Sequence, residues 1–373
     1  MRARLFALLA AGLLGGSMPA PASAASAKVA AAGQREAVLA LIQAKMTALN
    51  IPGLQIAVVH GGRIVMNEAL GVANLEQASP VTLETRFSIN SATKSFTGVA
   101  ALQLVEAGKL DLDAPISQYL GDLPAAWRAI PVHHLLSHQS GLPDMVDSEG
   151  VIGSSAAESW AAVYAKPVEA PAGSRFAYNQ TNYALLGRII SQQAGMDFGA
   201  FFQQRQFAPA GMGRTLFGDS DDIIPGRAPS YSFYRHVRGF GGRPGDDIKG
   251  SVLGHWRDEF PAQMRAGAGI ITTATDMANW LIALDQGRLM RPKTRSRMWQ
   301  ADRLADGKAG EWAMGWPVLE SRGRRILAGI GGARSAFFVY PDHDLAIVVV
   351  TNLAAGNPQR FMDDVAQLYL GSR

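Results

Sequence analysis

The sequence of 373 residues contains no cysteine. Disulfide bonds, thiolate metal sites and a cysteine nucleophile are therefore excluded. The chain also has little excess of either charge, because 35 Lys and Arg residues are nearly balanced by 31 Asp and Glu residues, which gives a net charge of +4. This excess gives no electrostatic case for nucleic acid, although a pI near 9.4 leaves weak binding to anionic surfaces open. With 48% apolar and 18% charged residues, the chain is not disordered, collagen-like or coiled-coil.

The N-terminal segment is basic and then apolar, but its apolar run is short. Arg2 and Arg4 precede the run Leu5–Leu14, and Ala22-Ser23-Ala24 supplies the small residues that a signal peptidase requires. We predict a signal peptide over residues 1–24, with cleavage after Ala24 or, as second choice, Ala27. The alternative is a membrane anchor, for which roughly 20 apolar residues are needed. The mature protein is thus expected in the periplasm or secreted, with no stable membrane anchor after cleavage.

Segments with strand patterns lie at both ends of the chain. A helix is predicted over Glu36–Leu49. After it, a hairpin is predicted from two apolar segments, Leu54–Val59 and Ile64–Leu70, which flank His60-Gly61-Gly62-Arg63. Phe87–Asn90 then leads into Phe96–Val105, which is apolar around most of its circumference and predicts a buried helix. Further strands are predicted near the C-terminus, at Trp312–Leu319, Arg325–Ala328, Ser335–Tyr340 and Leu345–Thr351, before a last helix over Gln359–Leu370.

The middle of the chain carries short helical patterns separated by Pro and Gly loops, at Ile116–Leu120, Val132–Ser137, Ala156–Tyr164 and Tyr183–Gln193. The predicted fold class is therefore α/β (α+β). An antiparallel sheet is built from the N- and C-terminal strands and flanked by helices, and an all-helical lobe is inserted into it. Within a domain over 28–373, the α/β lobe is expected at about 28–111 and 266–373, and the helical lobe at about 112–265.

Ser91-Ala92-Thr93-Lys94 is an S-x-x-K pattern at the point where a strand-like segment turns into the buried helix. At a helix start, residues i and i+3 share a face, so the Lys94 amine can reach the Ser91 hydroxyl. A helix N-terminus and a desolvated cation both favour the state needed for nucleophilic catalysis. The competing interpretation is a helix-capping Ser beside a solvated Lys.

Three other features bear on chemistry. Tyr178 lies on a loop just before a helix that Thr181 or Asn182 caps, so its phenol could move a proton near Lys94; alternatively it is an interface aromatic bonded to backbone. His134 and His138 have metal-ligand spacing, but no Glu stands between them and no third ligand is evident. No serine lies in a G-x-S-x-G context, which argues against an α/β-hydrolase elbow.

Taken together, these motifs resemble the serine β-lactamase and penicillin-recognising superfamily, in its class C-like branch with lactamase-fold esterases and D-amino-acid peptidases. The resemblance extends from about residue 52 to the C-terminus. Its matching stretches, in family order and spacing, are 87–97, 134–143, 176–178, 181–187, 267–277 and Met314-Gly315-Trp316. The resemblance implies that Ser91 is the acylated nucleophile, Lys94 its activating partner and Tyr178 the general base. It implies no cofactor and no metal.

The sequence departs from the family pattern at two of its motifs. Gln180 stands where the family has Asn, so an amide on a longer arm is expected to bind the substrate's acyl side chain. The third family motif, Lys-Thr-Gly or His-x-Gly, appears as Gly329-Ile330-Gly331-Gly332-Ala333-Arg334-Ser335, with Gly329 at the cationic position. Backbone N–H groups of Ser91 and of a residue near Gly332 remain available for an oxyanion hole. Arg334 is the candidate replacement cation, although a solvated arginine is the expectation for this residue type.

The function predicted from these residues is that of an exported serine acyl hydrolase acting on a small ester, amide or peptide. Loss of the cation at Gly329 favours an esterase, or an amidase or peptidase acting on uncharged or N-terminally recognised substrates, over an efficient β-lactamase. The alternative is a non-catalytic ligand sensor or scaffold of the penicillin-recognition type. The two altered motifs favour it, and the intact Ser91, Lys94 and Tyr178 oppose it.

Overall fold

The structure is a computed structural model that describes residues 24–147, 150–153, 155–236 and 247–371. The predicted signal peptide, up to Ser23, lies outside these residues. The helices are α1 Ala24–Leu49, α2 Thr93–Glu106, α3 Val132–Leu136, α4 Ala156–Tyr164, α5 Gln180–Ala194, α6 Phe198–Phe202, α7 Ala208–Ala210, α8 Arg265–Ala268, α9 Ala274–Asp285, α10 Pro292–Met298 and α11 Met362–Leu370. The strands are β1 Gly53–His60, β2 Arg63–Asn74, β3 Ser79–Pro80, β4 Phe87–Ser88, β5 Val146–Asp147, β6 Gly150–Val151, β7 Leu216–Phe217, β8 Ser230–His236, β9 Asp247–Trp256, β10 Ile270–Thr272, β11 Val318–Ser321, β12 Arg324–Gly331, β13 Ser335–Tyr340 and β14 Leu345–Thr351.

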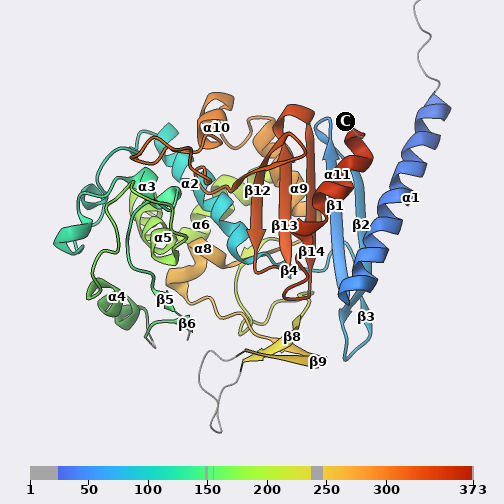
Figure 1. The fold of residues 1–373 in the computed structure, drawn as a ribbon, viewed down its shortest axis with the longest axis horizontal. Coiled ribbons are helices and arrows are strands. Elements are labelled where there is room, and N and C mark those ends of the chain that lie inside the picture. The colour runs from blue at the N-terminus through green and yellow to red at the C-terminus, as the bar shows by residue number, and fades with distance from the viewer. Residues whose placement is uncertain (1–23, 148–149, 154, 237–246, 372–373) are drawn as a thin grey trace, which may run out of the picture.

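The two ends of the chain build one sheet, as predicted. Seven strands run antiparallel in the order β11-β12-β13-β14-β1-β2-β3, so that the first strand pairs with the last, from Leu54 opposite Thr351 to His60 opposite Leu345 (Figure 1). The β1–β2 hairpin turns at Gly61 and Gly62, whose φ angles are both positive, at +59° and +72°. Two positive φ values are typical of the tight turns that glycine favours in hairpins.

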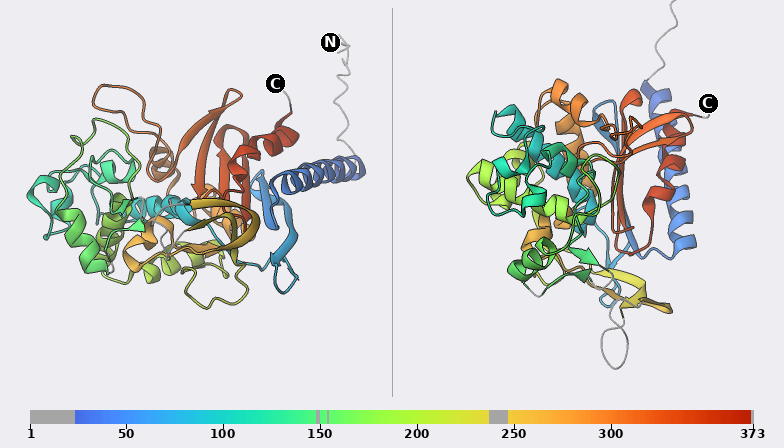
Figure 2. Two further views of the ribbon diagram at one scale, coloured as in Figure 1. Left: turned by 60° about the horizontal axis from the view of Figure 1, so that its bottom comes forward. Right: turned by 60° about the vertical axis from the view of Figure 1, so that its left-hand side comes forward.

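Each face of the sheet is covered by a separate hydrophobic core. On one face, α1 and α11 supply Val38, Ile42 and Val365 against Ile56 of β1. On the other face, Phe96 of α2 lies in a larger core. Buried side chains of α9 and of the segment between β4 and β10 also contribute to this core. The right-hand view of Figure 2 shows the sheet edge-on, between the α1 and α11 pair and the remaining helices. No helix among the described residues combines the length and apolar character that crossing a membrane requires.

The inserted segment is mainly helical, but it is not all-helical as predicted. It also contains the short strands β5, β6 and β7, and the hairpin of β8 and β9, which projects at the lower edge of the molecule in Figure 1. We predicted no strand there because glycine and polar residues interrupt the apolar alternation over 239–254. Pairing from Ser230 opposite Trp256 to His236 opposite Asp247 forms the hairpin nevertheless.

Several predicted boundaries differ from those in the structure, and three of these differences affect the elements around the site. The segment Trp312–Leu319 is a strand only from Val318, because Pro317 lacks the N–H that a ladder requires. Strand β12 continues past Ala328 to Gly331, which brings the third motif onto the strand. Helix α5 is capped by Asn179, whose side chain accepts a hydrogen bond from the Asn182 N–H, and not by Thr181 or Asn182.

Candidate active site

Ser91 lies in a short 3-10 turn, Asn90–Ala92, that joins β4 to the buried helix α2. Lys94 is one turn further on and is fully buried. Its Nζ lies 3.4 Å from Ser91 Oγ, and it donates to Gln180 Oε1 at 2.9 Å and to the Gly267 carbonyl at 3.0 Å. The i, i+3 spacing therefore places the lysine beside the serine, and the capping role considered for Ser91 is absent, since α2 has no side-chain cap.

Tyr178 contacts the same serine from the loop before α5. Its OH donates to Ser91 Oγ at 2.8 Å, and Lys94 Nζ lies 4.8 Å from the centre of its ring. The Tyr178 side chain is 40% exposed, so the pair is open to solvent on one side. A proton can pass between two oxygens at this distance, and the nearby ammonium stabilises negative charge on either of them.

His138 holds the segment that carries Tyr178. Its carbonyl accepts from the Ala177 N–H at 2.9 Å, its Nδ1 accepts from the Asn179 N–H at 3.1 Å, and its ring packs 4.5 Å from the Tyr178 ring. Burial, and secondarily the charge of Lys94, hold the pKa of His138 well below its usual value, so the ring is neutral. With Nδ1 engaged by the backbone, His138 serves as a packing and hydrogen-bonding residue. The sequence had offered a metal-ligand role for it, beside the match of its stretch to the family.

The metal alternative gains no support from the surroundings of these histidines. The ring of His134 packs 4.2 Å from that of His133, and burial, followed by the effect of His133, lowers the pKa of His134 to about 4. In the described part of the chain, no three His, Asp or Glu side chains are grouped as a metal site would need.

Asp144 is a neighbouring group that sequence reasoning missed. Its Oδ1 accepts from the Gln180 N–H at 3.1 Å, which places a carboxylate at the start of α5. Burial raises the pKa of Asp144, an effect that hydrogen bonds to backbone N–H groups and the positive charge of Lys94 partly offset. Asp144 follows Gly141-Leu142-Pro143, a loop with no helical or strand period, so no pattern in the sequence indicated it.

The strand β12 brings the third motif against the serine turn. A Cβ atom on Gly331 would lie 1.8 Å from the Ile89 carbonyl oxygen and 2.8 Å from Ser91 N, so only glycine allows so close an approach. Gly332 follows directly and is exposed. The main chain at Gly331 and Gly332 therefore borders the Ser91 amide.

The position of the expected family cation is filled by an aromatic ring. A Cβ atom on Gly329 would lie 2.1 Å from Cε1 of Phe337, the residue opposite it on β13. Phe337 is fully buried and packs edge-on against Trp316, with 5.3 Å between the ring centres. No open space therefore remains at Gly329 for a side chain.

Arg334 is not solvated, contrary to the expectation for it. Its side chain is 2% exposed and forms a two-pronged ion pair with Asp258, with Nη1 to Oδ2 at 2.5 Å and Nη2 to Oδ1 at 3.1 Å. Its Nη1 also donates to Ser230 Oγ at 2.7 Å. The physical reason is a carboxylate 76 residues away in the chain, which the sequence around Arg334 does not reveal. The guanidinium is consequently not available as a replacement cation for a substrate carboxylate.

Comparison with known proteins shows which family the chain belongs to. The sequence profile of the family described as Beta-lactamase matches residues 38–371. A D-aminopeptidase of Brucella anthropi is 29% identical over 320 residues, covering 82% of this chain and 57% of that protein, so the chain spans less than two thirds of its length. Among solved structures, D-amino acid amidase from Ochrobactrum anthropi SV3, complexed with D-phenylalanine, is 25% identical with a TM-score of 0.71, covering 93% of this chain and 100% of that one. EstCE1, a hydrolase with promiscuous acyltransferase activity, is 23% identical with a TM-score of 0.73 and the same coverage, and shows the fold alone.

Proposed function

This chain belongs to the beta-lactamase family, and on that premise we propose that it is an exported serine acyl hydrolase with an acyl-Ser91 intermediate. The observation that carries the proposal is the contact of Ser91 Oγ with both Tyr178 OH, at 2.8 Å, and Lys94 Nζ, at 3.4 Å. A serine with a proton acceptor and a fixed positive charge at hydrogen-bond range meets the geometric requirement for nucleophilic catalysis.

The reaction follows from these contacts. Tyr178, having lost its proton, accepts the Ser91 proton as Oγ bonds to the substrate carbonyl carbon, while Lys94 stabilises the phenolate. The oxyanion is bound by the N–H groups of Ser91 and Gly332. When the intermediate collapses, the bond to the leaving group breaks and Tyr178 returns the proton to it. Water then attacks the acyl-Ser91 ester in the reverse sequence and releases the acid.

Charge around the site supports a choice of substrate. Phe337 fills the position of the family cation, and Arg334 is neutralised by Asp258, so a substrate carboxylate has no free cation there. Gln180 and Asp144 remain on the other side of Ser91, where Lys94 engages the Oε1 of Gln180. The amide N–H₂ of Gln180 can donate to a carbonyl on the acyl side of the substrate, and the Asp144 carboxylate attracts a substrate ammonium. Neutral esters and amides, and substrates with a free amino group, are therefore favoured over β-lactams.

Labelling of the nucleophile tests the proposal directly. We expect a fluorophosphonate to add one phosphonyl group to Ser91, detected by intact mass and peptide mapping, and Ser91→Ala to lose both the adduct and p-nitrophenyl ester hydrolysis. The matched control is Ser174→Ala, an exposed serine on the same loop as Tyr178, which is expected to behave as wild type. A wild-type protein with neither adduct nor turnover would favour the sensor alternative. Efficient nitrocefin hydrolysis would contradict the substrate choice.

Export is tested separately. Expressed in a Gram-negative host, the protein should lose the segment up to Ala24 or Ala27 and be recovered from the periplasm, as shown by N-terminal sequencing. Recovery of intact Met1 in the cytoplasm would contradict export without affecting the proposed chemistry.

A further inference from the structure

A buried carboxylate connects three segments that are far apart in the chain. Asp258 is 7% exposed and lies in the connection after β9. Its two oxygens accept the two-pronged contact from Arg334, and Oδ1 also accepts from Asn90 Nδ2 at 3.3 Å. Arg334 lies between β12 and β13, and Asn90 lies directly before Ser91.

Asn90 controls the direction of the Ser91 N–H. The N–H of Ser91 belongs to the peptide group that joins these two residues, so the backbone angles of Asn90 set where it points. Asn90 has a φ of +45°, a conformation that costs energy in residues other than glycine and is kept where surrounding contacts impose it. Its side chain supplies such contacts, with Nδ2 bound to Asp258 and Oδ1 accepting from Ser88 Oγ at 3.2 Å.

Arg334 controls the other amide. Gly332 has a φ of +55°, and a Cβ atom there would lie 2.7 Å from Cγ of Asn90, so its main chain packs against the Asn90 side chain. The turn that holds Gly332 is closed by the Arg334 N–H, which donates to the Gly331 carbonyl at 3.0 Å. The Arg334 guanidinium reaches back to the Gly332 carbonyl, with Nε at 3.5 Å.

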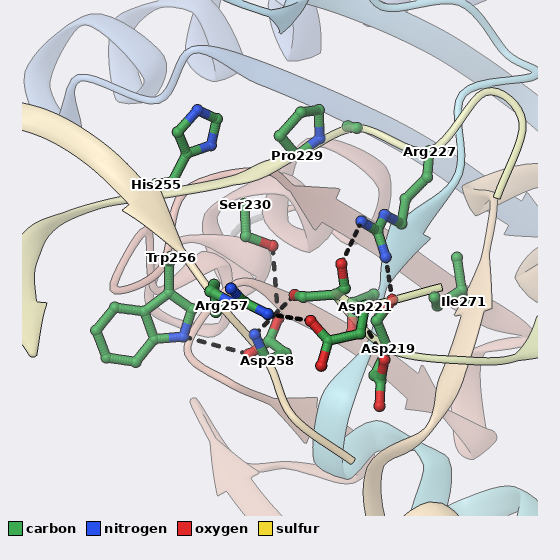
Figure 3. A pocket seen from close by; sticks show the side chains of 13 residues that line it. Asp219, Asp221, Arg227, Pro229, Ser230, His255, Trp256, Arg257, Asp258 and Ile271 are labelled. Atoms are coloured by element: carbon green, nitrogen blue, oxygen red, sulfur yellow. Dashed lines mark hydrogen bonds and ion pairs between the residues drawn. The ribbon is translucent and has the colours of Figure 1, made fainter. Parts of the chain in front are cut away.

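The remaining hydrogen bonds of Asp258 also come from protein neighbours. Trp256 Nε1 donates to Oδ1 at 3.2 Å, and Ser230 Oγ donates to Oδ2 at 3.5 Å. Figure 3 shows these side chains along the wall of a pocket of about 370 Å³ whose lining does not include Ser91. With both carboxylate oxygens occupied, the Asp258 side chain acts on its protein neighbours.

We propose that Asp258 and Arg334 are positioning residues that align the two N–H donors of the oxyanion hole, those of Ser91 and Gly332. The proposal rests on the proposed function, because an oxyanion hole matters only if Ser91 is acylated. Asp258 holds Asn90, which orients the first donor, and Arg334, which orients the second. The buried ion pair of Arg334 and Asp258 therefore serves the geometry of the transition state and not the recognition of a carboxylate.

The decisive variant is Asn90→Gly, which keeps the positive φ accessible and leaves the Arg334–Asp258 pair intact while removing the link between it and Ser91. Asp258→Asn is the second variant, and it keeps one oxygen acceptor. The matched control is Asp276→Asn, a buried carboxylate that accepts from Thr215 Oγ1 at 2.8 Å and touches no site residue among its hydrogen bonds. Each purified protein is assayed for kcat and KM with a p-nitrophenyl ester, for affinity to phenylboronic acid, for pH profile and for melting temperature.

We expect Asn90→Gly and Asp258→Asn to lower kcat about 10- to 100-fold with KM changed by less than about threefold. A misaligned N–H donor stabilises the oxyanion less than an aligned one, and the loss is smaller than when the donor is removed. Boronate affinity should fall in step, since the boronate forms an oxyanion, whereas the pH profile should not move because Lys94 and Tyr178 are untouched. Asp276→Asn should keep wild-type kcat and boronate affinity.

Four outcomes would overturn the inference: a folded Asn90→Gly with wild-type kcat, a rise in KM at constant kcat, boronate affinity unchanged despite a lower kcat, or an equal loss in Asp276→Asn. If Asp258→Asn does not fold, Asn90→Gly alone decides. If the wild type shows no Ser91-dependent hydrolysis, the proposed function fails instead, so the two failures are distinguishable.

Discussion

Ser91 has a helix side and a strand side, and they are built in opposite ways. The helix side, which carries Lys94, Tyr178 and Gln180, keeps charged and proton-carrying groups in direct contact with the serine or with one another. The strand side offers the backbone of Gly331 and Gly332, while Phe337 fills the space at Gly329 and Asp258 neutralises Arg334. The groups proposed to move protons and the strand position where the family carries a cation therefore lie on different sides of Ser91.

This difference indicates which half can change without loss of chemistry. In the proposed reaction, proton transfer at Ser91 uses specific side chains at 2.8 to 3.4 Å, whereas oxyanion binding uses only N–H groups, which every residue except proline supplies. The strand side can therefore have Phe337 against Gly329 in place of a cation and still keep its main-chain donors. Four predictions test this division, in order of decreasing effect.

Removal of the Tyr178 hydroxyl should break the helix side most strongly. Tyr178→Phe is expected to lower kcat about 10²- to 10⁴-fold, the range for loss of a general acid–base group, with little change in KM. Because the side chain is 40% exposed, the melting temperature should stay close to that of the wild type. Stopped-flow and steady-state ester hydrolysis measure the loss. Wild-type kcat in a folded Tyr178→Phe would assign the proton transfer to Lys94 alone.

Asp144→Asn should separate substrates by charge. If the carboxylate attracts a substrate ammonium, kcat/KM for a D-alanine p-nitroanilide should fall about 10-fold or more, because a charge-assisted hydrogen bond contributes roughly 1.5–3 kcal/mol. Hydrolysis of p-nitrophenyl acetate, which carries no amine, is the internal control and should change less than about twofold. Equal losses with both substrates would show that Asp144 acts only through the Gln180 N–H.

Gly329→Ala should sharpen the account of the strand side through stability. The added Cβ would lie 2.1 Å from the buried Phe337 ring, so the ring or the strand must shift. Overpacking of this kind costs about 1–3 kcal/mol of unfolding free energy, measurable by urea denaturation. A matched substitution in an exposed turn where a Cβ meets nothing, Gly213→Ala, is the control. An unchanged stability in Gly329→Ala would mean that the space above β12 is open.

Acid should weaken the support of the helix side. The pKa values of His138 and His134 are lowered, the latter to about 4, so both rings are neutral in the folded protein. In the unfolded chain both histidines titrate at about 6.5, so below that pH the unfolded state binds more protons than the folded state. The contribution of the neutral rings to the free energy of unfolding is therefore lost as pH falls below that value. For His134 alone, after a discount for its partial exposure, we expect the free energy of unfolding to fall by about 1 kcal/mol between pH 7.5 and pH 5.

Comparison of the wild type with His134→Gln in urea unfolding isolates this contribution. The raised pKa of buried Asp276 acts in the opposite sense, stabilising the fold as pH falls, and it cancels in the difference between the two proteins. The variant should lose less stability than the wild type over the same pH range. Identical pH dependence in both proteins would contradict the lowered pKa.

Local patterns in the sequence predicted the helix side better than the strand side. Ser91 and Lys94 are three residues apart, so helical geometry alone brings them together. Within the sheet, the boundaries of β13 and β14 were also predicted, because each strand is a local apolar run. The contact of Tyr178 with Ser91 spans 87 residues. The loop before the helix suggested a proton-moving role for Tyr178 near Lys94, and the family resemblance implied the role of general base. The catalytic roles of these residues stay predictions.

The groups that were missed depend on contacts between distant segments. Asp258 pairs with Arg334 across 76 residues and with Asn90 across 168, and no periodicity connects them. Arg334 was expected to be solvated because arginine usually is, and only the buried partner overrides that tendency. The hairpin of β8 and β9 was missed for a related reason, since its glycines weaken the alternation that identifies a strand.

The ring of Phe337 above Gly329 has a consequence for how this protein could evolve. A lysine or histidine introduced at Gly329 would meet the ring, and a smaller residue at position 337 would leave a cavity beside Trp316, so each change alone lowers stability. Recognition of a carboxylate at this strand thus requires two substitutions whose benefits appear only together. A single substitution at Gly329 or at Phe337 is therefore expected to lower the free energy of unfolding without adding a usable cation at this strand.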